Sequence, residues 1–320
     1  MWKKQQLESS TYLKEHSSLQ HHIEHYTPSI QLFLNQINQI ILDKPVQTKL
    51  SLVCLLANGH VLFEDLPGLG KTTLASALAK LAGLHFNRIQ FTNDMLASDV
   101  IGMNMFNQKE SNFEFKHGPI FTQILLADEI NRCSPKTQSA LLQAMEEGVV
   151  TLDSVTYKLP EPFWVIATQN PIFQSGTYAL PESQLDRFLM RLSLGYPSRA
   201  AEKSLLLDAS RQTLLEQITP VLSHGDIVLM QQCVQQVYLS DVVLNYILDL
   251  ASYSRLQSHG LSTRALLAIK MAAQALAFVE GREYVITDDI QTVFPAVAAH
   301  RMKMTEQDAH LLLDQVEVND

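Results

Sequence analysis

Two short stretches of this chain carry residues suited to chemistry. Residues 65–72 read DLPGLGKT, and residues 124–129 read ILLADE, an apolar run that ends in two adjacent carboxylates. The first stretch has the glycines and the basic and hydroxyl side chains that cradle a polyphosphate, and the second has acids that suit a metal ion and a water molecule. Together they predict a site that binds a nucleoside triphosphate with Mg²⁺ and hydrolyses it.

The glycine-rich stretch lies between an apolar run of strand type, His60–Glu64, and a segment of helical composition, Thr72–Leu81. Glycines let the backbone N–H groups turn inward, and the start of the following helix favours an anion at the same point. Lys71 is expected to reach the outer phosphates as a catalytic cation, and Thr72 to ligate Mg²⁺. Asp65 stands where the strict motif has glycine, so the match is imperfect. The residues expected to contact ATP here are Pro67, Gly68, Leu69, Gly70, Lys71, Thr72 and Thr73.

The paired acids at the end of the second stretch need a reason, because a buried strand that ends in unpaired carboxylates is costly. Asp128 is predicted to orient the magnesium ion, and Glu129 to polarise the attacking water as general base. The alternative is that both acids are solvated and cap the helix predicted over residues 136–147, but that leaves Lys71 without a role.

The elements that position these residues alternate along the chain. Between residues 60 and 194, apolar runs alternate with helical segments, which predicts an α/β domain with a parallel sheet covered by helices. After about residue 196 only helical periods remain, so an all-helical domain follows. The predicted domains are residues 1–27, a polar extension, residues 28–195 and residues 196–320. The predicted strands are His60–Glu64, Leu84–Phe91, Gln123–Asp128, Phe163–Thr168 and Leu189–Leu194.

Two inserts in the α/β domain predict β-hairpins. Residues 99–117 contain alternating runs on both sides of residues 108–112, and residues 149–159 place Asp153 and Ser154 at a turn. Neither insert has a cluster of basic residues, and the net charge of the chain is −9. Both facts disfavour nucleic acid as the main partner, because binding to its backbone needs clustered lysines and arginines.

Composition indicates where the protein works. The three cysteines, Cys54, Cys133 and Cys233, are odd in number and far apart, which is typical of reduced thiols in the cytoplasm. No stretch reaches the roughly 18 apolar residues of a membrane span, and the N-terminus lacks the apolar segment of a signal peptide. His21 and His25 form an i, i+4 pair, but the sequence places no third metal ligand near them. We therefore expect an unexported cytoplasmic protein.

Several motifs, in order, resemble the MoxR family of AAA+ ATPases over roughly residues 41–300. This resemblance implies an αβα P-loop core with a five-stranded parallel sheet and two hairpin inserts, followed by an all-α lid. It also implies ATP and Mg²⁺ as cofactors, a homo-oligomeric ring with six subunits, and a partner that carries a von Willebrand factor A domain. The motifs are FEDLPGLGKT, RIQFTNDMLASDVIG, DEINRCSPKTQSALLQAMEE, LPEPFWVIATQNP, TYALPESQLDRF and GLSTRA.

The resemblance assigns three further residues. Asn170 matches the first sensor, whose amide hydrogen-bonds the terminal phosphate or the lytic water, although an Asn before a proline is also a common turn residue. Arg187 matches the arginine finger that completes the site of a neighbouring subunit, the alternative being a helix pair with Glu182 or Asp186. Arg264 matches the second sensor on the lid, and Thr263 stands there in place of the family's usual proline.

The function predicted from the sequence is chaperone-like remodelling or maturation of protein clients by an ATP-hydrolysing ring. A nucleic-acid translocase and the motor subunit of a metal chelatase share the same core and remain alternatives. A nucleotide-locked assembly scaffold with little turnover is a third alternative, which the presence of both Glu129 and Arg187 disfavours.

Overall fold

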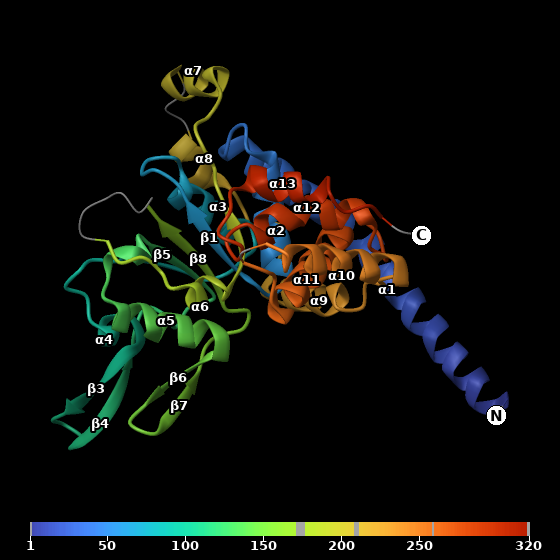
Figure 1. Ribbon diagram of the computed structural model, residues 1–320. Helices are drawn as coiled ribbons and strands as arrows, with labels where there is room; N and C mark the ends of the chain where they lie inside the picture. Colours follow the sequence, from blue (N-terminus) through green and yellow to red (C-terminus); the bar gives the residue numbers. More distant parts are fainter. Residues whose placement is uncertain (1, 171–176, 208–210, 258, 319–320) are drawn as a thin grey trace. The chain divides into compact units, whose positions relative to one another are not determined.

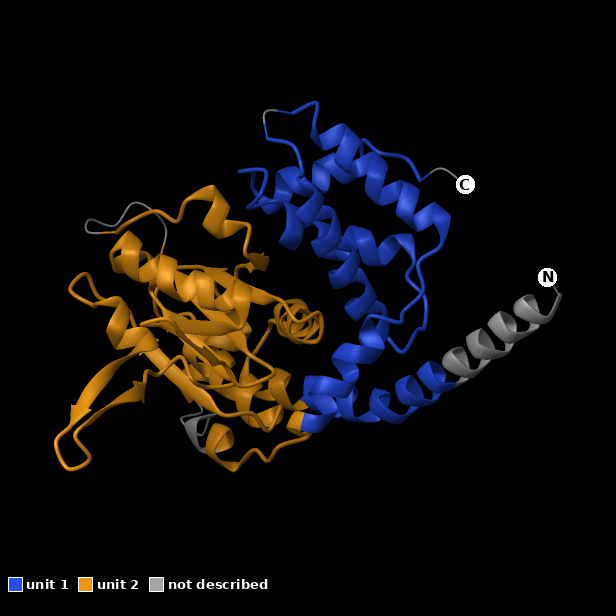
Figure 2. Ribbon diagram, turned by 90° about the horizontal axis from the view of Figure 1, so that it is seen from below, with its two compact units in different colours: residues 1–35, 225–320 blue, residues 36–224 orange. Residues whose placement is uncertain are grey.

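The computed structural model describes the chain except for residues 1, 171–176, 208–210, 258 and 319–320. For residues 2–17 and 211–213 it describes the backbone alone. The chain divides into two compact units, which are coloured in Figure 2. The core unit comprises residues 36–224, and the helical unit comprises residues 1–35 and 225–320.

A five-stranded parallel sheet forms the centre of the core unit, with the strand order β2-β5-β8-β1-β9 (Figure 1). The parallel sheet predicted from the alternation of apolar runs and helices is confirmed. Because every crossover returns the chain in the same direction, the carboxyl ends of all five strands lie at one edge of the sheet. The strands are β1 (His60–Glu64), β2 (Phe86–Gln90), β5 (Ile124–Asp128), β8 (Trp164–Gln169) and β9 (Phe188–Leu192).

The sheet is buried on both faces, which explains why its central strands are apolar throughout rather than alternating. On one face Leu125 and Val165 pack with Leu141, Leu142 and Met145 of α5. On the other side α2 contacts β1 and β9, and α3 contacts β5. The helices of this unit are α2 (Pro45–Leu56), α3 (Lys71–Leu81), α4 (Ala97–Ile101), η1 (Ile130–Arg132), α5 (Pro135–Glu147), α6 (Glu182–Leu185), α7 (Arg199–Leu207) and α8 (Arg211–Gln217).

The ends of these helices follow from local chemistry. Pro45 opens α2, where its missing N–H costs nothing. Ser134 caps α5 by accepting a hydrogen bond from the N–H of Thr137, and Gly148 ends the helix in the left-handed conformation, φ +65°. Gly148 therefore has a structural role as the C-cap that leads directly into the second hairpin.

Both predicted hairpins are confirmed, and they lie side by side in Figure 1. The first pairs β3 (Gly102–Asn107) with β4 (Asn112–His117), and the second pairs β6 (Val149–Leu152) with β7 (Val155–Lys158). Phe115 of the first stacks on Tyr157 of the second with ring centroids 4.1 Å apart, and Asn104 donates to Asp153 Oδ2 at 2.6 Å. These contacts hold the two hairpins together as one projection.

The helical unit contains helices and an isolated bridge between Tyr238 and Tyr284. It includes most of α1 (Trp2–Ile40), together with α9 (His224–Val234), α10 (Asp241–Ser254), α11 (Thr263–Val279), α12 (Thr287–Ala298) and α13 (Glu306–Leu313). Ser262 is the N-cap of α11, because its side chain accepts a hydrogen bond from the N–H of Ala265. The helix therefore begins at Thr263 without the proline that the family usually has at this position.

The boundaries of the units differ from the predicted ones at both places. Residues 18–27 pack within the helical unit instead of forming part of a separate extension, because Leu19, Ile23 and Tyr26 are at most 5% exposed and Tyr26 donates to Asp226 Oδ1 at 3.1 Å. The spacing of these residues, continued by Ile30 and Phe33, is an apolar stripe along α1 that the surrounding histidines and polar residues obscure in the sequence. At the other boundary, residues 196–224 belong with the core unit.

Among the helices that the structure describes, none is both long enough and apolar enough to cross a membrane. The described residues also contain no group of three or more His, Cys, Asp or Glu side chains placed to hold a metal ion, and this includes the histidines of α1 from position 18 onward.

Candidate functional site

The glycine-rich loop joins the carboxyl end of β1 to the start of α3, which is the arrangement that the sequence predicts. Gly68 and Gly70 have φ angles of +84° and +89°, in the left-handed region that favours glycine. A Cβ atom added at either position would face open space within 4 Å, so it is the backbone conformation that requires glycine there. The loop therefore turns around an open concavity at the positive end of α3.

Lys71 is the first residue of α3 and is 7% exposed. Its Nζ donates to the carbonyl oxygens of Asp65 and Leu66, at 2.9 Å each. Burial lowers the pKa of Lys71, and the negative charges of Asp65, Asp128 and Glu129 oppose that shift. A buried ammonium group whose hydrogen bonds go to backbone carbonyls rather than to a carboxylate suits the binding of an anion.

Asp65 shows why glycine is absent from the first position of the loop. Its carboxylate accepts hydrogen bonds from Ser193 Oγ at 2.7 Å, from the N–H of Leu194 at 2.7 Å and from the N–H of Gly195 at 3.1 Å. Asp65 is 6% exposed. It therefore ties the loop to the segment that leaves β9, a role that a side chain with several acceptor lone pairs can fill and glycine cannot.

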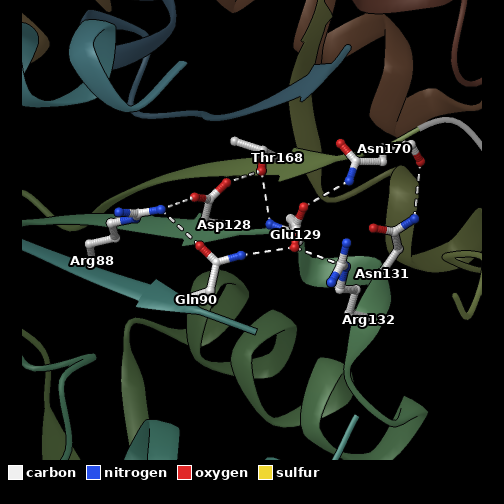
Figure 3. Close-up of polar contacts among 8 residues, drawn as sticks. All are labelled: Arg88, Gln90, Asp128, Glu129, Asn131, Arg132, Thr168 and Asn170. Carbon is white, nitrogen blue, oxygen red and sulfur yellow. Dashed lines mark hydrogen bonds and ion pairs between the residues drawn. The ribbon is translucent and has the colours of Figure 1, made fainter. Parts of the chain in front are cut away.

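Asp128 ends β5, Glu129 directly follows it, and the two acids face different partners (Figure 3). Asp128 is 8% exposed; its Oδ1 accepts from Thr168 Oγ1 at 2.6 Å, and its Oδ2 accepts from Arg88 Nη2 at 2.7 Å. Thr168 also accepts the N–H of Glu129 at 2.8 Å. A single hydroxyl at the end of β8 thus aligns both acids.

Glu129 adopts the left-handed conformation, φ 58°, which costs a non-glycine residue about 1–2 kcal/mol. This turn directs the carboxylate away from the strand and toward three donors (Figure 3). Oε1 accepts from Asn170 Nδ2 at 2.8 Å, and Oε2 accepts from Gln90 Nε2 and Arg132 Nε, both at 2.8 Å. Backbone strain at a carboxylate surrounded by polar groups is a frequent feature of catalytic sites.

One cavity of about 400 Å³ brings the predicted phosphate-binding residues, except Leu69, together with Asp128, Glu129 and Asn170. A second cavity, of about 570 Å³, shares four of the loop residues and adds apolar side chains such as Ile40, Ile41 and Leu205. The residues fit Mg²⁺ and ATP, since the first cavity has hydroxyl and carboxylate oxygens for the metal and a cation for phosphate, while the second has room for an apolar ring. The first cavity is lined by Pro67, Gly68, Gly70, Lys71, Thr72, Thr73, Arg88, Gln90, Asp128, Glu129 and Asn170.

Two residues of this cavity were not singled out from the sequence. Arg88 contacts Asp128 and Gln90 contacts Glu129, and both lie on the edge strand β2. The sequence could have pointed to them, because Arg88 and Gln90 are polar residues at positions i and i+2 near the carboxyl end of a predicted strand. Side chains at such positions lie on the same face of the strand.

The two remaining predicted arginines lie elsewhere. Arg187 directly precedes β9, so it lies at the amino end of its strand, opposite the edge where the acids end β5. Its Nη2 forms an ion pair with Glu146 Oε2 of α5 at 3.1 Å. Arg264 is exposed in the first turn of α11 in the helical unit. The core unit by itself therefore brings Lys71, Thr72, Asp128, Glu129 and Asn170 together but not Arg187.

The fold and the site define a P-loop ATPase of the AAA class, and comparison with known proteins agrees. The model of the ATPase family associated with various cellular activities (AAA) matches residues 60–190, and that of the AAA lid domain matches residues 254–318. The chain is 37% identical over 282 residues to Chaperone MoxR1 of Mycobacterium tuberculosis, which covers 84% of this chain and 74% of that protein. The chain belongs to the MoxR family of AAA+ ATPases.

Further relatives span similar lengths. YeaC of Bacillus subtilis is 47% identical over 280 residues, covering 87% of this chain and 88% of that protein. A crystal structure from Cytophaga hutchinsonii, described as a candidate ATPase, superposes with a TM-score of 0.86 at 34% identity and covers 96% of this chain and 99% of that chain. An MCM homolog from Methanopyrus kandleri, at 16% identity and a TM-score of 0.58, shares the fold alone.

Proposed function

We propose that this protein is a Mg²⁺-dependent ATPase that works as a homo-oligomeric ring and remodels protein clients. The observation that carries the ATPase proposal is the meeting of Lys71, Asp128 and Glu129 in one cavity. Bound ATP with Mg²⁺ supplies the phosphoanhydride bond and neutralises charge on the transferred group. The glycine-rich loop, Lys71 and Thr72 would hold the phosphates and the metal together with Asp128.

Glu129 is the general base in this proposal. Asn170 donates to one carboxylate oxygen of Glu129 at 2.8 Å, which orients it, and the left-handed turn presents it to the cavity. Glu129 would take a proton from the attacking water, and the Asn170 amide, which lines the same cavity, would hydrogen-bond that water or the terminal phosphate.

The sheet topology supports a finger supplied by another subunit. The cavity residues follow the carboxyl ends of β1, β5 and β8, whereas Arg187 precedes the amino end of β9 in the same parallel sheet. Five-residue strands are about 17 Å long, so Arg187 lies far from the cavity of its own subunit. We therefore propose that Arg187 completes the cavity of a neighbouring copy, as arginine fingers do.

The client class rests on the family. One relative is named a chaperone, and by that likeness we propose protein clients, with a protein that carries a von Willebrand factor A domain as partner and the cytoplasm as the place of action. The β3–β4 hairpin carries Lys109 and Lys116 against Glu110 and Glu114, which does not favour a nucleic-acid translocase.

The test of the ATPase proposal is the variant Glu129→Gln. The amide keeps the shape of the side chain but cannot take a proton, so we expect ATP binding to persist and turnover to fall by about 10²–10⁴. Binding is measured with a fluorescent ATP analogue and turnover by phosphate release. A Glu129→Gln variant that hydrolyses ATP at the wild-type rate contradicts the assignment of the base, and a wild-type protein that does not turn over ATP supports the scaffold alternative.

A further inference from the structure

Arg88 is the one cation of the phosphate cavity, apart from Lys71, among the residues that the structure describes. It lies on the edge strand β2, where it is in register with Leu126, two residues before Asp128. Its Nη2 is 2.7 Å from Asp128 Oδ2 and 2.8 Å from Gln90 Oε1, and its side chain is 46% exposed (Figure 3). Arg88 therefore combines a contact to the predicted metal ligand with access to the cavity.

Both oxygens of Asp128 are occupied in this arrangement. Oδ1 accepts from Thr168, which lies in the buried strand β8, and Oδ2 accepts from Arg88. A carboxylate that is 8% exposed needs a counter-charge, and Arg88 supplies it. A divalent cation would use the same outward oxygen and would repel the guanidinium, so the two compete for Asp128.

We infer that Arg88 takes the place of the magnesium ion on Asp128 when nucleotide is absent, and that its guanidinium passes to the phosphate oxygens when the metal arrives with ATP. In the empty site Arg88 keeps Asp128 paired and keeps free divalent cations out. In the loaded site the displaced guanidinium already lines the cavity that holds the phosphates, for which its fork of N–H donors is suited. Arg88 is thus a positioning residue that makes metal binding depend on nucleotide. The inference rests on the proposed ATPase function.

The experiment measures binding of Mn²⁺ alone, as a paramagnetic probe for Mg²⁺, to the nucleotide-free full chain. Arg88→Gln removes the competing charge, so we expect it to bind Mn²⁺ roughly tenfold more tightly than the wild type. Arg88→Lys keeps the charge and is expected to restore weak binding. Arg191→Gln is the matched control, because Arg191 pairs with Glu64 at 3.1 Å in the same sheet and is outside the cavity lining; its Mn²⁺ affinity should equal that of the wild type.

A second measurement tests whether the Arg88 guanidinium contacts the phosphates once the metal ion is bound. A fluorescent ATP analogue is titrated in Mg²⁺ and in EDTA, and Arg88→Gln should lose affinity in Mg²⁺, where the guanidinium is free for phosphate, by a larger factor than in EDTA. Unchanged Mn²⁺ affinity in a folded Arg88→Gln variant, or equal losses in Mg²⁺ and EDTA, overturns the inference. If the wild type binds and hydrolyses ATP, either of these results overturns only the inference about Arg88 and leaves the proposed ATPase function standing. A wild type that binds no ATP analogue refutes both the inference and the proposed function.

Discussion

Asp65→Gly would bring the loop into line with the strict glycine motif, and we expect it to destabilise the protein. The carboxylate that it removes accepts two backbone N–H groups, those of Leu194 and Gly195, and the hydroxyl of Ser193. A buried N–H group without an acceptor costs about 1–3 kcal/mol, and a glycine adds about 0.5–1 kcal/mol of backbone entropy. The hydroxyl can rotate to another acceptor, so it adds little.

The expected loss of free energy of unfolding is about 3 kcal/mol, since the N–H of Leu194 is buried and that of Gly195 is partly buried. With a urea m value of about 2 kcal/mol/M, the midpoint should fall by about 1.5 M. Asp65→Asn keeps one acceptor oxygen but turns an N–H₂ group toward a donor, so its midpoint should fall about half as far.

The assay uses urea unfolding followed by tryptophan fluorescence in a Trp2→Phe background, because Trp164 then remains as the single tryptophan. Trp164 begins β8 in the core unit and is 2% exposed, so its fluorescence reports the unit that contains the loop. A midpoint in Asp65→Gly equal to or above that of the parent would refute the reasoning, and would mean that the motif describes this position better than the contacts do.

Arg187→Ala should lower ATP turnover by about 10³–10⁵. Mixing it with the inactive Glu129→Gln variant should restore part of the activity, because a Glu129 from one subunit then meets an Arg187 from the other; no recovery on mixing, together with oligomers of normal size, contradicts a finger supplied in trans. His60 is 8% exposed, and burial lowers its pKa from 6.5 to about 4. The unfolded chain therefore takes up the proton first as the pH falls below about 6.5, and stability is lost progressively until about pH 4. At pH 5 this amounts to about 2 kcal/mol relative to neutral pH, measured by urea unfolding. The variant His60→Gln should lose less than the wild type over the same pH range, and equal losses would assign the pH dependence to other groups.

Local patterns in the sequence are sufficient to predict the helices, strands and hairpins around the site. The glycine-rich loop, the apolar runs and the turn at Asp153 and Ser154 each depend on neighbours in the chain, and the structure has the corresponding strand, helix or hairpin within a few residues. The adjacency of Asp128 and Glu129 in sequence also ensures that both acids reach the same edge of the sheet. Their meeting with Lys71 follows once the sheet is parallel.

The α1 helix shows where local patterns are insufficient. Its apolar stripe is diluted by polar and histidine residues, and only burial against the helical unit reveals that Leu19, Ile23 and Tyr26 belong to a core. Residues 18–35 pack with residues 225–318 across some two hundred positions, as the Tyr26–Asp226 hydrogen bond illustrates, and no periodicity within one segment encodes its partner.

The sequence by itself therefore determined the class of site, because the residue types and spacings of a phosphate-binding loop and of paired acids act over a few positions. Tertiary structure alone decided which distant residues contact the residues of that site. The contacts of Arg88 with Asp128, of Asp65 with residues 193–195 and of Arg187 with Glu146 join residues roughly 40 to 130 positions apart. Strand register and sheet order set these contacts, and both are properties of the packed sheet rather than of any one strand.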